Sequence, residues 1–284
     1  IDCTLVATCM GRLDDLQQSL PTWIAQPGVQ IVVVDYSCPQ KCGVWLEQHF
    51  PSVRVVRVSG KTYFDRSDAK NFGIQAVQTQ WTLLVDADVQ LHPDFLRSIG
   101  ALSRPNRYLR SDHVGEGTGG TMLVETERLR DVGGHDPLYV GWGEEDDDLV
   151  DALRFAGLDS ARFPARLLQH AAHGDDARME NHEADDRERT HLINRLYRTA
   201  KWDLARLMGE VPIIQQRRIL HQRATTTVDR MLTSGRSATL EVDAGTMQSP
   251  PTCRSLRRCL TYVVSPQDKA ASRQDKTPSR IDHR

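Results

Sequence analysis

Short apolar runs alternate with amphipathic stretches along the first part of the chain. Leu13, Leu16 and Leu20 recur at helical spacing, with Ile24 on the same stripe, and predict a helix over residues 12–24. The apolar runs are typical of buried strands and cover residues 2–8, 31–34, 53–58 and 81–85. Further helices are predicted over residues 43–50 and 67–78. Strands that alternate with helices in this way predict an α/β domain with a mostly parallel, twisted sheet flanked by helices.

The pattern changes in the second half of the chain. A strand is predicted over residues 122–125, and a helix is predicted from an acidic run to residue 156. Long Arg-rich helices follow, and beyond them Ser, Thr, Pro, Arg and Gln dominate, which is typical of a disordered basic tail. The expected organisation is a globular domain over residues 1–184, a helical extension over 185–234 and a disordered tail over 235–284.

Composition narrows the class of protein. The chain has 284 residues, 36 Lys and Arg against 38 Asp and Glu, and a net charge of −2. This balance argues against a nucleic-acid partner. No apolar run approaches the length of a membrane-spanning helix, so we expect a cytoplasmic protein. The Arg content of the C-terminal helices leaves peripheral contact with a membrane open. Of the six cysteines, Cys38 and Cys42 stand close together, and we interpret all six as free thiols because a zinc site would need further ligands.

Three clusters of polar residues carry candidate chemistry. Asp86 and Asp88 directly follow the strand predicted over 81–85, at the sheet edge where α/β proteins bind ligands. Such oxygen ligands suit a hard divalent ion, although an Asp pair in a loop is more often a turn or a helix cap. His170 and His173 are spaced so that both can reach one metal ion, although two unrelated histidines are the commoner explanation.

The third cluster is residues 141–149, which read Gly-Trp-Gly-Glu-Glu-Asp-Asp-Asp-Leu. A helix N-terminus offsets part of the repulsion between five consecutive carboxylates. The glycines on either side of Trp142 suggest an indole presented for stacking on a sugar. Crowding by like charges is expected to raise the pKa of a carboxylate in this run, which would suit a general base.

The order of these clusters resembles the GT-A glycosyltransferases that have a galactosyltransferase-type C-terminal region, such as β-1,4-galactosyltransferases and bacterial chondroitin-polymerase-like enzymes. The resemblance covers about residues 3–185, and the Trp-Gly-x-Glu-Asp-Asp-Asp motif carries most of it. It implies a GT-A fold, with a nucleotide-binding half over 1–90 and an acceptor and metal half over 91–184. The cofactor implied is Mn²⁺ or Mg²⁺.

The resemblance also implies roles for individual residues. Asp88, His170 and His173 correspond to the metal ligands, and Asp86 would lie beside the nucleotide. Asp146 corresponds to the catalytic base and Glu145 to its acceptor-binding neighbour. The residues expected at the donor are Arg66 at the diphosphate, Arg12 at the uridine, Asp35 at the nucleoside and Trp142 beside both sugars.

The implied reaction is an inverting, metal-dependent transfer of a hexose or N-acetylhexosamine from a UDP-sugar to a hydroxyl of a carbohydrate or other acceptor. Three departures from the family pattern stand out: residues 8–12 read Thr-Cys-Met-Gly-Arg, Glu144 replaces a glycine, and Gly117 stands where galactosyltransferases carry a bulky aromatic residue. Without a bulky aromatic residue at position 117, a donor that carries an N-acetylhexosamine is also possible. The alternatives are a retaining transferase of the polypeptide N-acetylgalactosaminyl type, a metal-dependent nucleotidyltransferase and a non-catalytic sugar-nucleotide-binding protein.

Overall fold

The computed structural model describes residues 1–112, 118–170, 186–247 and 256–266. The chain divides into two compact units. The N-terminal unit comprises Ile1–Tyr139 and Glu145–Asp185, and the C-terminal unit comprises Val140–Glu144 and Asp186–Arg284. The short segment Val140–Glu144 therefore belongs to the C-terminal unit, although the residues before and after it in sequence belong to the N-terminal unit.

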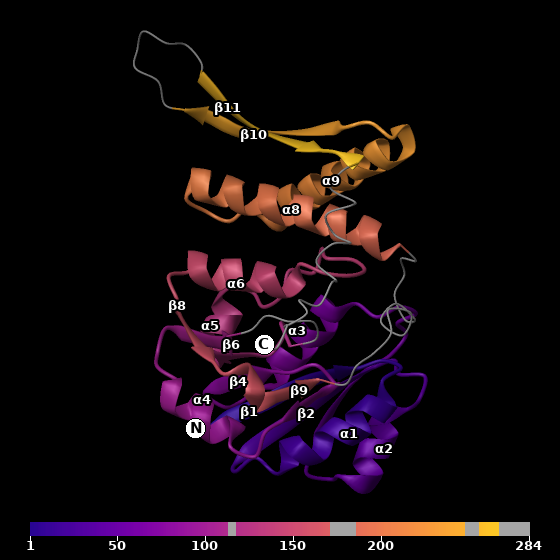
Figure 1. The fold of residues 1–284 in the computed structure, drawn as a ribbon, viewed down its shortest axis with the longest axis vertical. Coiled ribbons are helices and arrows are strands. Elements are labelled where there is room, and N and C mark those ends of the chain that lie inside the picture. The colour runs from indigo at the N-terminus through magenta and orange to yellow at the C-terminus, as the bar shows by residue number, and fades with distance from the viewer. Residues whose placement is uncertain (113–117, 171–185, 248–255, 267–284) are drawn as a thin grey trace, which may run out of the picture. The chain divides into compact units, whose positions relative to one another are not determined.

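A seven-stranded sheet forms the middle of the N-terminal unit (Figure 1). Its strand order is β3-β2-β1-β4-β7-β6-β8. Its strands are β1 (Cys3–Cys9), β2 (Val29–Tyr36), β3 (Arg54–Val58), β4 (Trp81–Leu84), β6 (Arg107–Ser111), β7 (Met122–Glu125) and β8 (Asp159–Phe163). Only β7 runs antiparallel to both of its neighbours. All other neighbouring pairs in this sheet are parallel, which confirms the predicted mostly parallel α/β architecture.

Helices pack on both faces of this sheet, because successive side chains of a strand point to opposite sides. Leu5 of β1 packs into one hydrophobic cluster and Val6 into another. The Leu5 cluster includes side chains of α1 (Leu13–Ile24), α2 (Cys42–His49) and α4 (Phe95–Leu102). The Val6 cluster includes side chains of α3 (Arg66–Ala76), α5 (Thr126–Asp131) and α6 (Glu145–Phe155).

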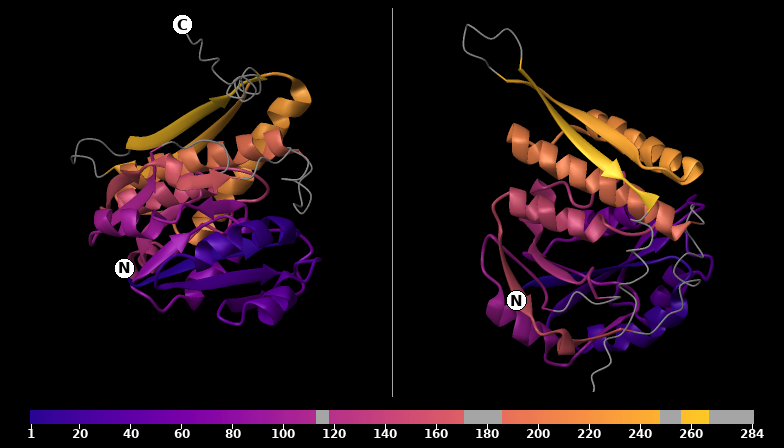
Figure 2. Two further views of the ribbon diagram at one scale, coloured as in Figure 1. Left: turned by 60° about the horizontal axis from the view of Figure 1, so that its bottom comes forward. Right: turned by 45° about the horizontal axis from the view of Figure 1, so that its top comes forward.

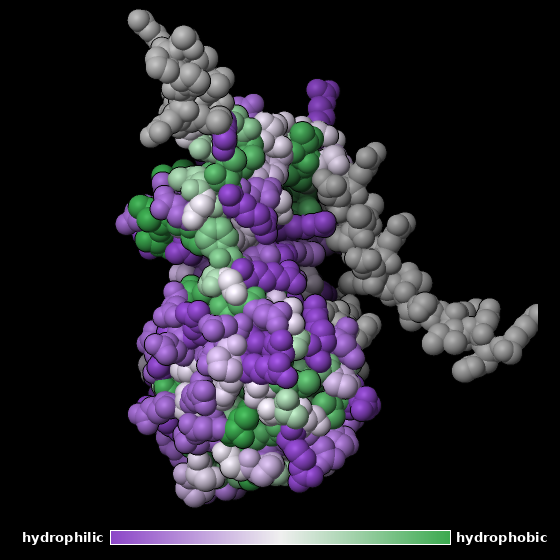
Figure 3. Space-filling model, turned by 90° about the vertical axis from the view of Figure 1, so that its left-hand side faces the viewer, coloured by the Kyte–Doolittle hydropathy of each residue, from purple (hydrophilic) through white to green (hydrophobic). Residues whose placement is uncertain are grey.

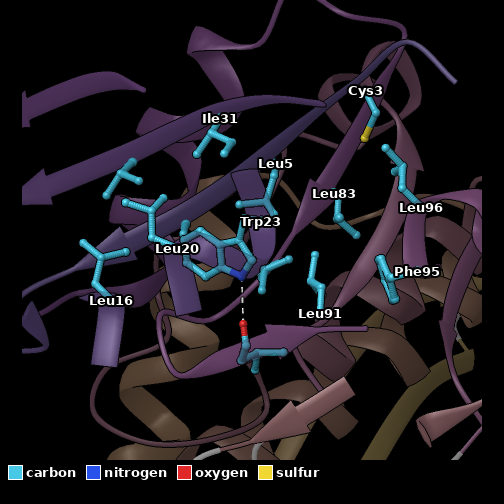
Figure 4. Close-up of a cluster of buried hydrophobic side chains, with 14 of the residues drawn as sticks. Cys3, Leu5, Leu16, Leu20, Trp23, Ile31, Leu83, Leu91, Phe95 and Leu96 are labelled. Carbon is cyan, nitrogen blue, oxygen red and sulfur yellow. Dashed lines mark hydrogen bonds between the residues drawn. The ribbon is translucent and has the colours of Figure 1, made fainter. Parts of the chain in front are cut away.

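A second, two-stranded sheet pairs β5 (Val89–Leu91) with β9 (Leu168–His170), and side chains of β5 belong to the Leu5 cluster. A short 3₁₀ turn at Ala165–Leu167 precedes β9. Trp23 of α1 anchors this sheet, since its indole N–H donates to the Val89 carbonyl at 2.8 Å (Figure 4). The Trp23 side chain is fully buried among Leu5, Leu20 and neighbouring residues. The core of the unit thus fixes the backbone next to Asp88.

The C-terminal unit contains α8 (Arg187–Met208), α9 (Ile214–Ser234) and an antiparallel hairpin of β10 (Ala238–Met247) and β11 (Leu256–Val264) (Figure 2). The hairpin shows that the prediction of disorder from residue 235 is wrong for these two strands. Leu240 and Val242 alternate with polar residues, so one face of β10 is buried while the hairpin contacts α8 and α9. The alternation is short, and the polar composition of the surrounding residues favoured the interpretation as a disordered tail. Residues 267–284 lie outside the described part of the chain.

Hydrophilic residues dominate the surface of the N-terminal unit on the face shown in Figure 3, and larger hydrophobic areas occur on the C-terminal unit. The exposed apolar side chains of α9 and the segment before it include Ile213 and Ile219. Among the described residues, none of the helices has the length and apolar character needed to cross a membrane.

Candidate active site

The last four carboxylates of the acidic run, residues 145–148, form the first turn of α6, where Asp146 meets Lys70 of α3. The Lys70 ammonium lies 2.8 Å from an Asp146 oxygen and 3.5 Å from an Asp86 oxygen, and the Lys70 side chain is almost completely buried. Asp86 lies two residues after the end of β4, so the lysine joins the end of a central strand to the start of α6. The structure therefore brings together the Asp-x-Asp segment and the acidic motif, which are far apart in sequence.

Each carboxylate in the first turn of α6 has its own partner within the N-terminal unit. The pairs are Arg66 with Glu145 at 3.1 Å, Lys70 with Asp146 at 2.8 Å, Arg110 with Asp147 at 3.1 Å, and the Tyr139 hydroxyl with Asp148 at 2.9 Å. These contacts add to the favourable interaction of anions with a helix N-terminus. Mutual repulsion within the run is thus offset by cationic and hydrogen-bonding groups from other elements.

These partners reverse the expected pKa shift of Asp146. Burial raises the pKa of this carboxyl, but the Lys70 ammonium, with His135 and Arg66, more than offsets burial and lowers the pKa to about 2. The prediction of a raised pKa from like-charge crowding is therefore wrong for Asp146. Asp86 behaves in the opposite way: withdrawal from water and repulsion by Asp146 raise its pKa despite the attraction of Lys70. Asp146 is ionised at neutral pH and available to accept a proton.

His135 is a further buried group next to this pair. Burial, followed by the nearby Lys70 ammonium, lowers the pKa of His135 to about 4. The imidazole is therefore neutral at physiological pH. Its backbone is fixed by Asn71 of α3, whose amide oxygen accepts from the His135 N–H and whose amide nitrogen donates to the His135 carbonyl, both at 2.8 Å.

Two of the three predicted metal ligands lie together. Asp88 directly precedes β5, and His170 ends β9, where it pairs in register with Val89. The His170 Nε2 atom is 3.0 Å from an Asp88 oxygen. A carboxylate oxygen and an imidazole nitrogen at this separation suit Mn²⁺, so the donor set fits such an ion. The third predicted ligand, His173, lies outside the described residues.

Gly120 lines the space between the two acidic segments. A Cβ atom at this position would lie 2.8 Å from an Asp86 oxygen and 2.9 Å from an Asp146 oxygen. Arg110 holds this turn as well as α6, since its guanidinium also donates to the Gly119 carbonyl at 3.3 Å. The absence of a side chain at position 120 therefore allows both carboxylates to occupy the site.

Glu144 and Trp142 belong to the C-terminal unit. Glu144 has a φ of 76°, a conformation that favours glycine, which explains why the resembling family has glycine there. Here the glutamate is held by His191 at 3.0 Å and Arg198 at 2.7 Å, both from α8. Trp142 packs between the Arg187 guanidinium, 3.8 Å from the ring centroid, and the edge of His191. Its role at the sugars stays a prediction.

Arg12 lies after β1, and Asp35 lies within β2. Arg12 precedes α1 and pairs with Asp15 at 3.3 Å. The Asp35 carboxylate accepts the backbone N–H groups of Cys38 at 2.9 Å and Gly43 at 3.1 Å, so it orders the loop between β2 and α2. Contact of either residue with a nucleoside stays a prediction. Gly117, the position linked to donor choice, is outside the described residues.

Sequence patterns assign no role to four residues of this site: Lys70, Arg110, His135 and Gly120. Lys70 lies four residues after Arg66, which the sequence placed at the diphosphate, so it is the most accessible of the four from the sequence. The other three act through contacts between distant segments. Only the folded chain reveals them.

Two family models match adjoining parts of the chain that overlap at residues 103–108. Residues 4–108 match Glycosyl transferase family 2, and residues 103–174 match a model described as the N-terminal domain of galactosyltransferase. A curated relative, β-1,4-galactosyltransferase 7 of Drosophila melanogaster, is 30% identical over 107 residues. That match covers 35% of this chain and 33% of the relative, so the chain spans about a third of the relative's length.

Solved structures support the same fold. The mannosyltransferase PcManGT from Pyrobaculum calidifontis, in complex with GDP-Man and Mn²⁺, has a TM-score of 0.52 at 16% identity, over 82% of this chain and 74% of that chain. TarS 1–349 of S. aureus, in complex with UDP-GlcNAc, has a TM-score of 0.54 at 11% identity, over 83% and 92%. The N-terminal unit has the GT-A fold. Residues 4–174 are thus similar to glycosyltransferase domains, with the first part matching family 2 and the second part matching the galactosyltransferase model.

Proposed function

We propose that this protein transfers a hexose or N-acetylhexosamine from a UDP-sugar to an acceptor hydroxyl, with inversion at the anomeric carbon and in a metal-dependent manner. The observation that carries the proposal is the arrangement around Lys70, which joins Asp86 after a central strand to Asp146 in the acidic motif. The GT-A fold and the two family matches support sugar transfer. The structural relatives' own complexes contain GDP-Man with Mn²⁺ or UDP-GlcNAc, which supports a nucleotide-sugar donor.

Asp88, His170 and His173 would hold Mn²⁺ or Mg²⁺. When bound, the ion would neutralise negative charge on the diphosphate as the nucleotide departs. Arg66 would assist from α3, because the carboxylates around it keep its guanidinium charged despite burial and raise its pKa. Arg12, Asp35 and Asp86 would contact the nucleotide, and Trp142 would stack on the transferred or accepting sugar.

Asp146 would act as the general base. Its carboxylate is ionised, and it would take the proton of the acceptor hydroxyl as the oxygen bonds to the anomeric carbon. A base with a low pKa accepts this proton late, once bond formation has made the hydroxyl acidic. Glu145, held by Arg66, would orient the acceptor. An anionic diphosphate near Asp86 would compete for the Lys70 ammonium and would raise the pKa of Asp146 towards that of a more effective base.

The test is a donor screen with and without Mn²⁺, using UDP-Gal, UDP-GalNAc, UDP-Glc, UDP-GlcNAc and UDP-GlcA, and GDP-Man as the comparison nucleotide. We expect Mn²⁺-dependent release of UDP from at least one donor. In the variant Asp88→Asn, we expect Mn²⁺ affinity to fall by about 10- to 100-fold or more. Asp94→Asn changes an exposed carboxylate of the same unit and should leave affinity unchanged.

The outcomes separate the alternatives. A product with retained anomeric configuration would replace the inverting mechanism with that of the polypeptide N-acetylgalactosaminyl type. Binding of UDP-sugars without turnover in the presence of varied acceptors would favour a non-catalytic sugar-nucleotide-binding protein. Failure to bind any donor or Mn²⁺ would overturn the proposal.

A further inference from the structure

Three buried cysteines converge at the carboxyl end of the first two strands. Cys9 ends β1, Cys38 follows β2, and Cys42 begins α2. Their sulfur atoms all lie within 4.8 Å of one another, and the Cys9 and Cys38 sulfurs are 3.9 Å apart. All three are free thiols, and Cys9 and Cys42 are completely buried. The sequence shows only the proximity of Cys38 and Cys42, whereas the parallel pairing of β1 with β2 adds Cys9.

The backbone around the sulfurs is fixed by contacts that do not involve them. Asp35 accepts the N–H groups of Cys38 and Gly43 through different oxygens, so one carboxylate spans the loop. The Lys41 N–H donates to the Cys38 carbonyl at 2.9 Å, and Lys41 has a φ of 54°. This tight turn places Cys42 back beside Cys38. Three sulfurs are therefore held in place before any ligand binds.

A backbone donor also points at one sulfur. The Gly11 N–H lies 3.3 Å from the Cys38 Sγ atom, and such a hydrogen bond stabilises a thiolate. Small apolar packing alone would require neither a polar donor at the sulfur nor three sulfurs within 4.8 Å of one another.

We propose that Cys9, Cys38 and Cys42 bind one thiophilic metal ion as three thiolates. Each thiol releases its proton to solvent as its sulfur bonds to the ion, and no electron is transferred. Soft thiolate ligands select ions such as Cu(I) and Zn(II). Within the described residues no fourth His, Cys, Asp or Glu joins the cluster, and this favours Cu(I), because structural zinc sites are almost always four-coordinate.

The ion would tie the loop after β1 to the loop after β2. Arg12 lies on the loop after β1, and Asp35 lies near the end of β2, three residues before Cys38, so both proposed nucleotide contacts adjoin the bridge. The site uses none of the residues proposed to hold Mn²⁺ or Mg²⁺. The inference therefore stands or falls independently of the proposed sugar transfer.

The test is competition for Cu(I) and, separately, for Zn(II) between the fully reduced protein and a chromophoric chelator of each ion. We expect one ion per chain in the wild-type protein and in Cys3→Ala, which removes another buried thiol of β1. In Cys38→Ala we expect affinity to fall by at least about 100-fold. Cys259→Ala, at an exposed position, is a second control. Equal affinity in Cys38→Ala and the wild type would overturn the proposal.

X-ray absorption at the metal edge of the loaded wild-type protein covers the case in which Cys38→Ala fails to fold. A shell of three sulfur scatterers is the expected result. Tighter binding of Cu(I) than of Zn(II) would identify the ion, and the reverse order with an added oxygen scatterer would identify four-coordinate zinc on the same three thiolates. Failure of the reduced wild-type protein to retain either ion against its chelator would overturn the inference, whatever the donor screen shows.

Discussion

Lys70 and Asp146 form an ion pair of 2.8 Å between α3 and the first turn of α6. The same ammonium is 3.5 Å from Asp86, so one buried positive charge serves two carboxylates that would otherwise repel each other. The pair thereby sets the protonation state of the proposed base, which the sequence alone led us to expect with a raised pKa.

Replacement of this lysine tests the electrostatic account. In Lys70→Met the pKa of Asp146 should rise, because burial and Asp86 are no longer offset by the ammonium. The acid limb of the pH–rate profile at saturating metal should move to higher pH, and transfer should fall by about 100-fold or more. Lys61→Met, which removes an exposed lysine paired with Asp68, is the matched control. An unchanged acid limb would contradict the assignment.

The same variant has a predicted effect on stability. Because the pKa of Asp146 in the folded protein is about 2, below that of an unfolded Asp, its ionisation stabilises the fold above about pH 4. This contribution is lost as pH falls towards 2. In Lys70→Met it should be lost at higher pH. The loss at neutral pH should be smaller than the about 3–5 kcal/mol of a fully buried pair, since Asp146 is 23% exposed. Urea unfolding at several pH values measures it.

Trp23→Phe tests how the core positions the metal segment. Loss of the indole hydrogen bond to Val89 should cost about 1 kcal/mol, and loss of ring volume should add to that cost. Because Val89 adjoins Asp88, Mn²⁺ affinity should fall together with stability. Trp45→Phe, at a partly buried tryptophan of α2, should leave Mn²⁺ affinity unchanged. Reduced stability with full Mn²⁺ affinity in Trp23→Phe would show that this anchor does not position the site.

Gly120→Ala tests the space shared by the two acidic segments. The added methyl group would meet oxygens of Asp86 and Asp146 at less than 3 Å, so at least one carboxylate must move. We expect weaker donor binding and slower transfer with a folded protein. Gly100→Ala, where the nearest atom is a side-chain carbon of Ile1 at 3.3 Å, is the control. Normal kinetics in Gly120→Ala would remove Gly120 from the site.

The local pattern of apolar and polar residues predicts most of the helices and strands in the N-terminal half of the fold. The run at 31–34 and the helical stripe of Leu13 predicted β2 and α1 closely, because burial on both faces and period 3.6 are visible in the sequence. The small sheet of β5 and β9 was not predicted, since each strand has only three residues. Its pairing nevertheless places His170 beside Asp88.

Contacts between distant segments account for the rest. The acidic motif was visible, but the group that sets the charge state of Asp146 comes from α3, 76 residues earlier. Likewise, Glu144 could be recognised as a departure from glycine, whereas its support by His191 and Arg198 requires the fold of α8. Sequence patterns can identify a charged residue such as Asp146 or Glu144, but only the tertiary structure shows which residues it pairs with.

The measurement that tests the central claim most directly compares donor binding and transfer in Asp146→Asn. The amide keeps the shape of the side chain but cannot accept the hydroxyl proton. We predict transfer reduced by about 10²- to 10⁴-fold, with Mn²⁺-dependent UDP binding in calorimetry close to that of the wild type. Transfer at the wild-type rate in this variant would contradict the assignment of Asp146 as the base.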